Sequence, residues 1–135
     1  MLLHKIVQWG NQNPRKIFII DGIGACISSV MLGVILVHFE QLFGIPISTL
    51  YVLAIFPCLF AVYDLVCYFV NIKSISIYIK GIAVFNLLYC FLSLSFGIYH
   101  KEQITLLGWS YLIAEAIIIL LLASVELSIN SNTSN

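Results

Sequence analysis

The chain has 135 residues, of which 61% are hydrophobic and only 9% are charged. A water-soluble domain usually has about 25% charged residues, so a soluble fold of this length would lack the polar groups that cover a surface. The net charge is zero, so nothing in the composition indicates nucleic-acid binding through a basic patch. The composition therefore predicts a membrane protein.

Residues 1–13 precede the first long apolar run and predict a short amphipathic helix that lies on the membrane surface. Apolar residues share one helical face and polar residues the other: Leu2, Leu3, Ile6 and Val7 against His4, Lys5 and Gln8. Trp9 is expected at the level of the lipid headgroups, where the amphipathic indole ring is favoured.

Four apolar segments follow, at residues 17–39, 46–70, 77–99 and 104–127. Each exceeds the roughly 20 residues that a helix needs to cross about 30 Å of hydrocarbon. A backbone at that depth must satisfy its hydrogen bonds internally, so helices are expected. Because the connections are short, sequential helices should be antiparallel, which predicts an all-α, integral membrane, up-down four-helix bundle. The polar tail, 128–135, is expected to be disordered.

The basic residues predict the orientation in the membrane. Cytoplasmic loops carry an excess of Lys and Arg. One side of the predicted bundle carries five such residues and the opposite side carries one: Lys5, Arg15, Lys16, Lys73 and Lys80 against Lys101. Both termini are therefore expected to face the cytoplasm.

Four strongly polar residues, one from each apolar segment, lie in the cytoplasmic half or at the centre of the predicted spans: Asp21, Asp64, Asn86 and Glu115. An acidic residue at the centre of a spanning helix costs about 2.5–3.5 kcal/mol, so these side chains should face protein or water rather than lipid. Tyr89 or Tyr111 is expected to donate a hydrogen bond to Glu115, which lies nearest the midplane. The sequence thus predicts one interior polar site, made of Asp21, Asp64, Asn86, Tyr89, Tyr111 and Glu115.

Asp21 also lies close to two other features of the first segment. Arg15 and Lys16 are near enough along the helix for their side chains to reach it. Gly22, Cys26, Ser29 and Gly33 recur every three or four residues. They form a stripe of small residues on which another helix can pack closely.

Two interpretations of the polar residues stay open. They are either interhelical hydrogen bonds, worth about 0.6 kcal/mol each on average, or a site for a proton, an ion or a small polar ligand. Carboxyl groups without a buried cation favour proton exchange or cation binding over anion binding.

No catalytic residue and no cofactor is predicted, because the sequence has no Ser-His-Asp or Cys-His arrangement and no CxxC pair. An enzyme is therefore not expected. A weaker candidate for a metal site is formed by His38 and His100, which lie near Glu40 and Glu102 at the external helix ends, since His and carboxylate suit zinc.

The stretches NPRKIFIIDGIGA, FGIP, NLLYC and TLLGWSYLIAEA resemble small four-span bacterial inner-membrane proteins with no assigned activity. In size and number of spans the chain is also similar to DoxX-like membrane proteins and to the small multidrug resistance transporters. Those transporters carry a catalytic acidic residue well inside their first helix, whereas Asp21 lies nearer the edge here. The resemblance implies a four-helix bundle in a bacterial inner membrane.

The function predicted from the sequence is a small, non-enzymatic, multi-pass membrane protein whose interior carboxyl groups form a proton or small-ligand site. The first alternative is a proton-coupled transporter of small molecules, which would be a homo-oligomer because one four-helix bundle has little room for a pathway. The second is an accessory subunit with a membrane-protein partner, which would bind through the stretch GACISSVMLG. Membrane lipid is the expected surrounding partner in every case, and no nucleic acid is expected.

Overall fold

The computed structural model describes residues 2–70 and 73–129. Every regular element in these residues is a helix. Four helical stretches are long and apolar enough to cross a membrane: Pro14–His38, Ile47–Phe69, Ile75–Tyr99 and Leu106–Leu127. By length and composition these are the helices of an integral, multi-pass membrane protein, as the sequence predicts.

The N-terminal half begins with the helix α1 and continues with the first spanning stretch. Pro14 begins that stretch, ahead of the apolar run at residue 17, because proline at the first helical position loses no hydrogen bond and already has a helical φ. The elements are α1 (Leu2–Gln12), α2 (Pro14–Val30), the π-helical segment η1 (Met31–Ile35), α3 (Leu36–His38) and the short α4 (Glu40–Phe43).

The π-helical segment is a feature that the apolar pattern did not predict. A π turn inserts an extra residue into the helix and so changes the direction of the side chains that follow. Leu32 within it and Leu36 just after it are both fully buried in the core. The remaining elements are α5 (Ile47–Phe69), α6 (Ile75–Tyr99) and α7 (Leu106–Leu127).

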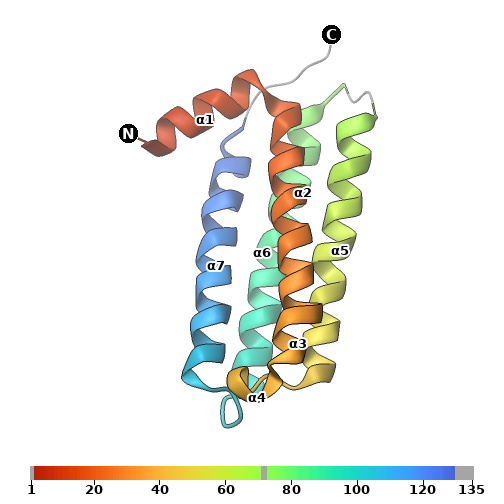
Figure 1. Ribbon diagram of the computed structural model, residues 1–135. Helices are drawn as coiled ribbons and strands as arrows, with labels where there is room; N and C mark the ends of the chain where they lie inside the picture. The colour runs from red at the N-terminus through yellow and green to blue at the C-terminus, as the bar shows by residue number, and fades with distance from the viewer. Residues whose placement is uncertain (1, 71–72, 130–135) are drawn as a thin grey trace.

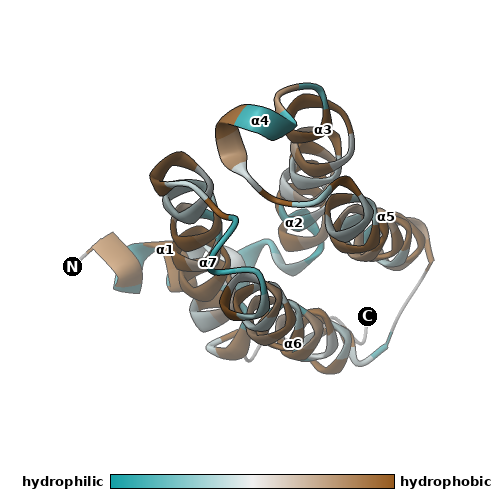
Figure 2. Ribbon diagram, turned by 90° about the horizontal axis from the view of Figure 1, so that it is seen from below, coloured by the Kyte–Doolittle hydropathy of each residue, from teal (hydrophilic) through white to brown (hydrophobic). Residues whose placement is uncertain are grey.

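The four spanning stretches lie side by side, and α1 extends sideways from the end where α2 begins and α7 ends (Figure 1). Seen along the helices, α2 lies beside α5 and α6 lies beside α7 (Figure 2). These two pairs are in close contact along their lengths, whereas α2 and α7 barely approach each other. The helices therefore form two tight pairs with a gap between α2 and α7.

The predicted stripe of small residues on the first spanning stretch, α2 and η1, is the surface against which α5 packs. A methyl group added to Gly22 would touch the Cβ of Asp64 at 3.4 Å, and one added to Gly33 would touch the Cβ of Ala54 at 3.3 Å. Ser29 also donates a hydrogen bond to the carbonyl oxygen of Ala54, at 3.1 Å. Small side chains let the two backbones approach each other closely.

Short elements connect α2 and α7 at both ends of the gap. At one end α4 reaches α7, where the Oγ1 of Thr105 donates to the carbonyl oxygen of Leu42 at 2.6 Å. At the other end α1 contacts both helices. A methyl group added to Gly10 of α1 would lie only 2.5 Å from the Cδ1 of Ile129. The gap is thus closed at its two ends and open in the middle.

The predicted disordered tail, 128–135, falls mostly outside the described residues. Its first two residues are described: Ser128 caps α7 and Ile129 is fully buried. Ile129 packs in a cluster with Ile17 and Ile79. The packed part of the chain therefore extends two residues further than the sequence predicted, because an apolar side chain at 129 can still reach the core.

Candidate functional site

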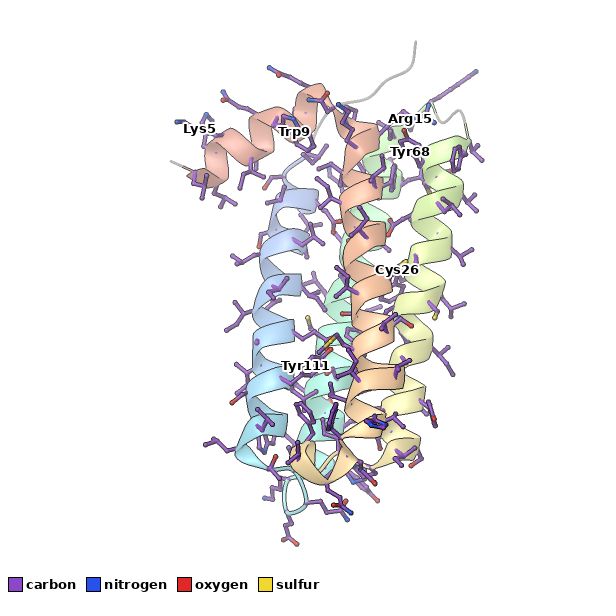
Figure 3. The ribbon with its side chains drawn as sticks, in the orientation of Figure 1. Lys5, Trp9, Arg15, Cys26, Tyr68 and Tyr111 are labelled. Carbon is purple, nitrogen blue, oxygen red and sulfur yellow. The ribbon has the colours of Figure 1, made fainter. Side chains whose placement is uncertain are left out.

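Glu115 is the acceptor of three hydrogen bonds from hydroxyl groups. Tyr89 donates to its Oε1 at 3.1 Å, Tyr111 donates to its Oε2 at 3.2 Å, and Ser28 donates to the same Oε2 at 2.8 Å. Glu115 as a whole residue is 7% exposed. Both tyrosines bind Glu115, where the sequence predicted one or the other, and Figure 3 shows Tyr111 on the side of α7 that faces the bundle. Residues from α2, α6 and α7 thus meet at one carboxyl group.

An ionised carboxylate can accept about four hydrogen bonds. The three hydroxyl groups occupy three of the positions on Glu115. No basic side chain lies at its depth, because the sequence has no Lys, Arg or His at residues 17–37, 47–72, 81–99 or 106–127. The surrounding helices therefore supply neutral donors to this group but no positive charge.

A second polar group lies closer to α1 and combines one residue from each spanning helix. Asn86 of α6 donates from its Nδ2 to Asp21 of α2 at 2.9 Å and to Glu126 of α7 at 3.2 Å. The carboxyl group of Asp21 also faces those of Asp64, on α5, and Glu126. We call Asp21, Asp64, Asn86 and Glu126 the carboxyl cluster.

The carboxyl cluster is deeply buried and short of hydrogen-bond donors. Asp64 is 1% exposed and Glu126 is fully buried. Within residues 2–70 and 73–129, no donor reaches either oxygen of Asp64, Oδ2 of Asp21 or Oε2 of Glu126. Carboxyl groups in contact repel each other unless a proton or a cation lies between them. The arrangement can therefore hold protons that the facing carboxyl groups share.

The sequence predicted one interior site, and the structure divides its residues between two groups. Asp21, Asp64 and Asn86 belong to the carboxyl cluster, whereas Tyr89, Tyr111 and Glu115 belong to the group around Glu115. The two groups lie at different depths because Ser28 follows Asp21 by about two turns on α2 and Glu126 follows Glu115 by about three turns on α7.

Two members of these groups were left out of the predicted site. Glu126 follows Glu115 by about three turns at 3.6 residues per turn, and this spacing predicts that both lie on one face, with Glu126 near the cytoplasmic end of the span. Ser28 lies on the same side of α2 as Asp21, but a serine in a spanning helix often bonds only to its own backbone. The hydrogen bond from Ser28 to Glu115 depends on where α7 lies, which the sequence of α2 does not determine.

A cavity of about 360 Å³ connects the two groups. Its side walls are α2 and α7, and its back wall is made of Pro57 and Phe60 of α5 together with residues of α6. Asp64 does not line the cavity. The polar side chains that line it come from both groups: Asp21, Asn86, Ser28, Tyr89, Tyr111 and Glu115. Most of the remaining lining is apolar.

The cavity opens toward the outside of the bundle between α2 and α7. Ile27 on one rim is 59% exposed and Ile118 on the other is 65% exposed. No described atom lies within 4 Å of a methyl group added to Gly24, which also lines the cavity. In a membrane this opening faces the lipid chains.

Arg15 does not approach Asp21 as the sequence suggested. Its guanidinium group donates to the carbonyl oxygen of Tyr68 and lies 5.6 Å from the centre of the Tyr68 ring. Figure 3 shows the two side chains together at the end where α2 begins and α5 ends. Arg15 therefore anchors the start of α2 to the end of α5. Asp21 instead accepts a hydrogen bond from Asn86 and faces the other carboxyl groups of the cluster.

The two histidines of the weaker metal candidate have separate neighbours. His100 shares a hydrogen bond of 3.1 Å with Thr49, and the ring of His38 lies edge-on to Phe39. The described part of the chain contains no group of three or more His, Cys, Asp or Glu side chains that could hold a metal ion. A metal site at these histidines has no support from the geometry.

Comparison with known proteins identified no matching family model, no matching curated protein and no matching solved structure.

Proposed function

We propose that this protein binds a small molecule in the cavity between α2 and α7, with Glu115 as the polar group that holds it. The observation that carries this proposal is the contact between the cavity and a carboxyl group that keeps one free acceptor position. Hydrogen bonds that only join helices need no space beside them. Ligand sites usually have a mostly apolar cavity of about 300–1,000 Å³ with a few polar groups that fix orientation.

The proposed setting is the bacterial inner membrane, with both termini in the cytoplasm. The excess of Lys and Arg at the end that carries α1 supports this orientation. We further propose that α1 lies in the membrane surface. The exposure of Leu2, Leu3, Ile6 and Trp9 supports it, since these apolar side chains would otherwise lie in water.

The first test is whether a molecule is bound when the protein is extracted from its membrane under mild conditions. Native mass spectrometry should detect a bound small molecule on the wild-type protein. The Ala114→Phe variant should lose it, because Ala114 lines the cavity at its exposed side and the larger ring would fill the opening. Ile117→Phe is the matched control, since Ile117 is 52% exposed on α7 and does not line the cavity. Equal occupancy in wild type and Ala114→Phe would count against the proposal.

A second candidate function is proton-coupled transport, in which the carboxyl cluster carries the protons. The facing carboxyl groups of Asp21, Asp64 and Glu126 favour it, because groups that share protons can also release them. The cavity reaches Asp21 and Asn86, so a ligand there would touch the same cluster.

This second function predicts proton flux through liposomes that contain the wild-type protein. Flux should fall to the background of empty liposomes in Glu126→Gln, because an amide retains hydrogen bonds but cannot release a proton. Ser124→Ala is a suitable control, since the hydroxyl group of the exposed Ser124 donates to the carbonyl oxygen of Leu120 in its own helix. Flux that is equal in wild type and Glu126→Gln would remove the cluster from any transport mechanism.

An accessory-subunit role remains a prediction without a structural observation in its favour. The small-residue stripe within GACISSVMLG was the surface expected to bind a partner. Ser29 and Gly33 of this stretch are in contact with Ala54 of α5 in the same chain.

A further inference from the structure

We infer that the ligand of the cavity is a lipophilic amine that reaches Glu115 sideways from the lipid bilayer, through the opening between α2 and α7. This inference rests on the proposed function and names its ligand class. It follows from the charge of the polar groups, from the position of the opening and from the chemistry of the walls.

The charge of the lining selects a cation. The cavity contains two carboxyl groups, Asp21 and Glu115, and none of its lining residues is basic. Glu115 already accepts from three hydroxyl donors, so one acceptor position is left, and no basic residue of the lining lies beside it. An ammonium group has both the N–H donor and the positive charge that this position lacks. A carboxylate or phosphate group would be repelled by the same residues.

The position of the opening selects a molecule dissolved in the membrane. The gap between α2 and α7 is closed at one end by α4, where the backbone N–H of Thr105 donates to the carbonyl oxygen of Phe43. It is closed at the other end by α1, which contacts both α2 and α7 (Figure 1). The part that remains open has Ile27 and Ile118 on its rims, and both are exposed in the apolar outer surface. A ligand therefore passes between lipid-facing side chains rather than through either end of the bundle.

The walls fit a hydrocarbon chain next to a positive charge. Ile119 and Leu122 on α7 and Met31 in the first span line the cavity and provide apolar surface for a chain. Phe60, Tyr89 and Tyr111 place aromatic rings around the end that contains Glu115. Aromatic faces attract ammonium groups electrostatically, most strongly where water is excluded.

The experiment compares three probes of equal chain length: n-octylamine, n-octanol and n-octanoate. The protein is held in phosphatidylcholine nanodiscs, and occupancy is measured by native mass spectrometry after release. We expect octylamine to bind at one molecule per chain and the other two probes to bind much more weakly. In Glu115→Gln the apparent octylamine affinity should fall about ten- to hundredfold, the usual effect of losing a hydrogen bond to a charged group.

Two further variants keep the test decisive if Glu115→Gln does not fold. Ala114→Phe should abolish octylamine binding by filling the opening. Ile117→Phe, with its ring on the lipid-facing side of the same helix, should leave binding unchanged. Both positions are exposed, so neither substitution disturbs the core.

The outcomes separate this inference from the proposed function. If octanol binds as well as octylamine and Ala114→Phe abolishes both, the cavity is a ligand site but the ligand is not an amine. If a phospholipid is bound to the wild-type protein and stays bound to the Glu115→Gln variant, the ligand is likewise not an amine held by Glu115. If no probe binds wild type and no molecule co-purifies with it, the proposed function fails together with the inference.

Discussion

Gly108→Ala should unfold at a much lower temperature than the wild-type protein. A methyl group at this position would lie 2.1 Å from the carbonyl oxygen of Phe43 and 2.8 Å from the Cγ2 of Ile104. The first contact is with backbone, so no side chain can rotate away and α4 itself must move. Overpacking of this kind typically costs about 1–3 kcal/mol, and a rigid backbone contact belongs at the upper end.

Gly24→Ala is the matched control for this substitution. No described atom lies within 4 Å of the added methyl group, and Gly24 is also in a spanning helix. Replacing a helical glycine by alanine favours the helix by roughly 0.5–1 kcal/mol, so this variant should be as stable as wild type or more so. Thermal unfolding followed by size-exclusion chromatography in detergent measures both. Equal midpoints for the two variants would show that α4 does not pack against Gly108 in the membrane protein.

Asn86→Leu should produce the second large loss of stability. The side chain of Asn86 is the donor to both Asp21 and Glu126. Leucine has a similar size but no donor, so two buried carboxyl oxygens would lose their hydrogen bonds. Leaving a buried polar group unsatisfied costs about 1–3 kcal/mol, and more when the group is charged. The expected result is a marked fall in the unfolding midpoint.

Ser93→Ala on the same helix provides the comparison for Asn86→Leu. Ser93 is 2% exposed, and no hydrogen-bond partner in the described residues reaches its hydroxyl oxygen. Its removal should therefore change stability little. Combining Asn86→Leu with Glu126→Gln should recover part of the loss, since the new amide can donate to Asp21. A double variant that is no more stable than Asn86→Leu alone would contradict the pairing of these residues.

The carboxyl cluster and the Glu115 group contribute differently to the proposed function. Glu115 accepts hydrogen bonds from three neutral donors, keeps one acceptor position and lines the cavity directly. The cluster is more deeply buried and connects to the cavity only through Asp21 and Asn86. A ligand at Glu115 could thus change the contacts of Asp21, which would couple binding to the protons that the cluster holds. The liposome and mass-spectrometry experiments address the two groups separately.

The sequence alone determined the class of protein and the direction in which its carboxyl groups face. Each of the four apolar runs exceeds the roughly 20 residues that a helix needs to cross the hydrocarbon core. They require helices because a backbone in lipid must satisfy its hydrogen bonds internally. The cost of a carboxyl group in lipid likewise requires Asp21, Asp64 and Glu115 to face the interior. Both conclusions depend on single segments, so no knowledge of neighbouring helices is needed.

The tertiary structure alone decided which helices pair and where the cavity lies. The pairing of α2 with α5 depends on how the glycines at 22 and 33 fit against Asp64 and Ala54. The participation of Ser28 and the separation of two polar groups depend on the rotation of each helix about its own axis. Side-chain packing between segments far apart in the chain sets that rotation, and the spacing within one helix does not determine it. The open gap between α2 and α7, on which the proposed ligand site depends, is a result of that packing.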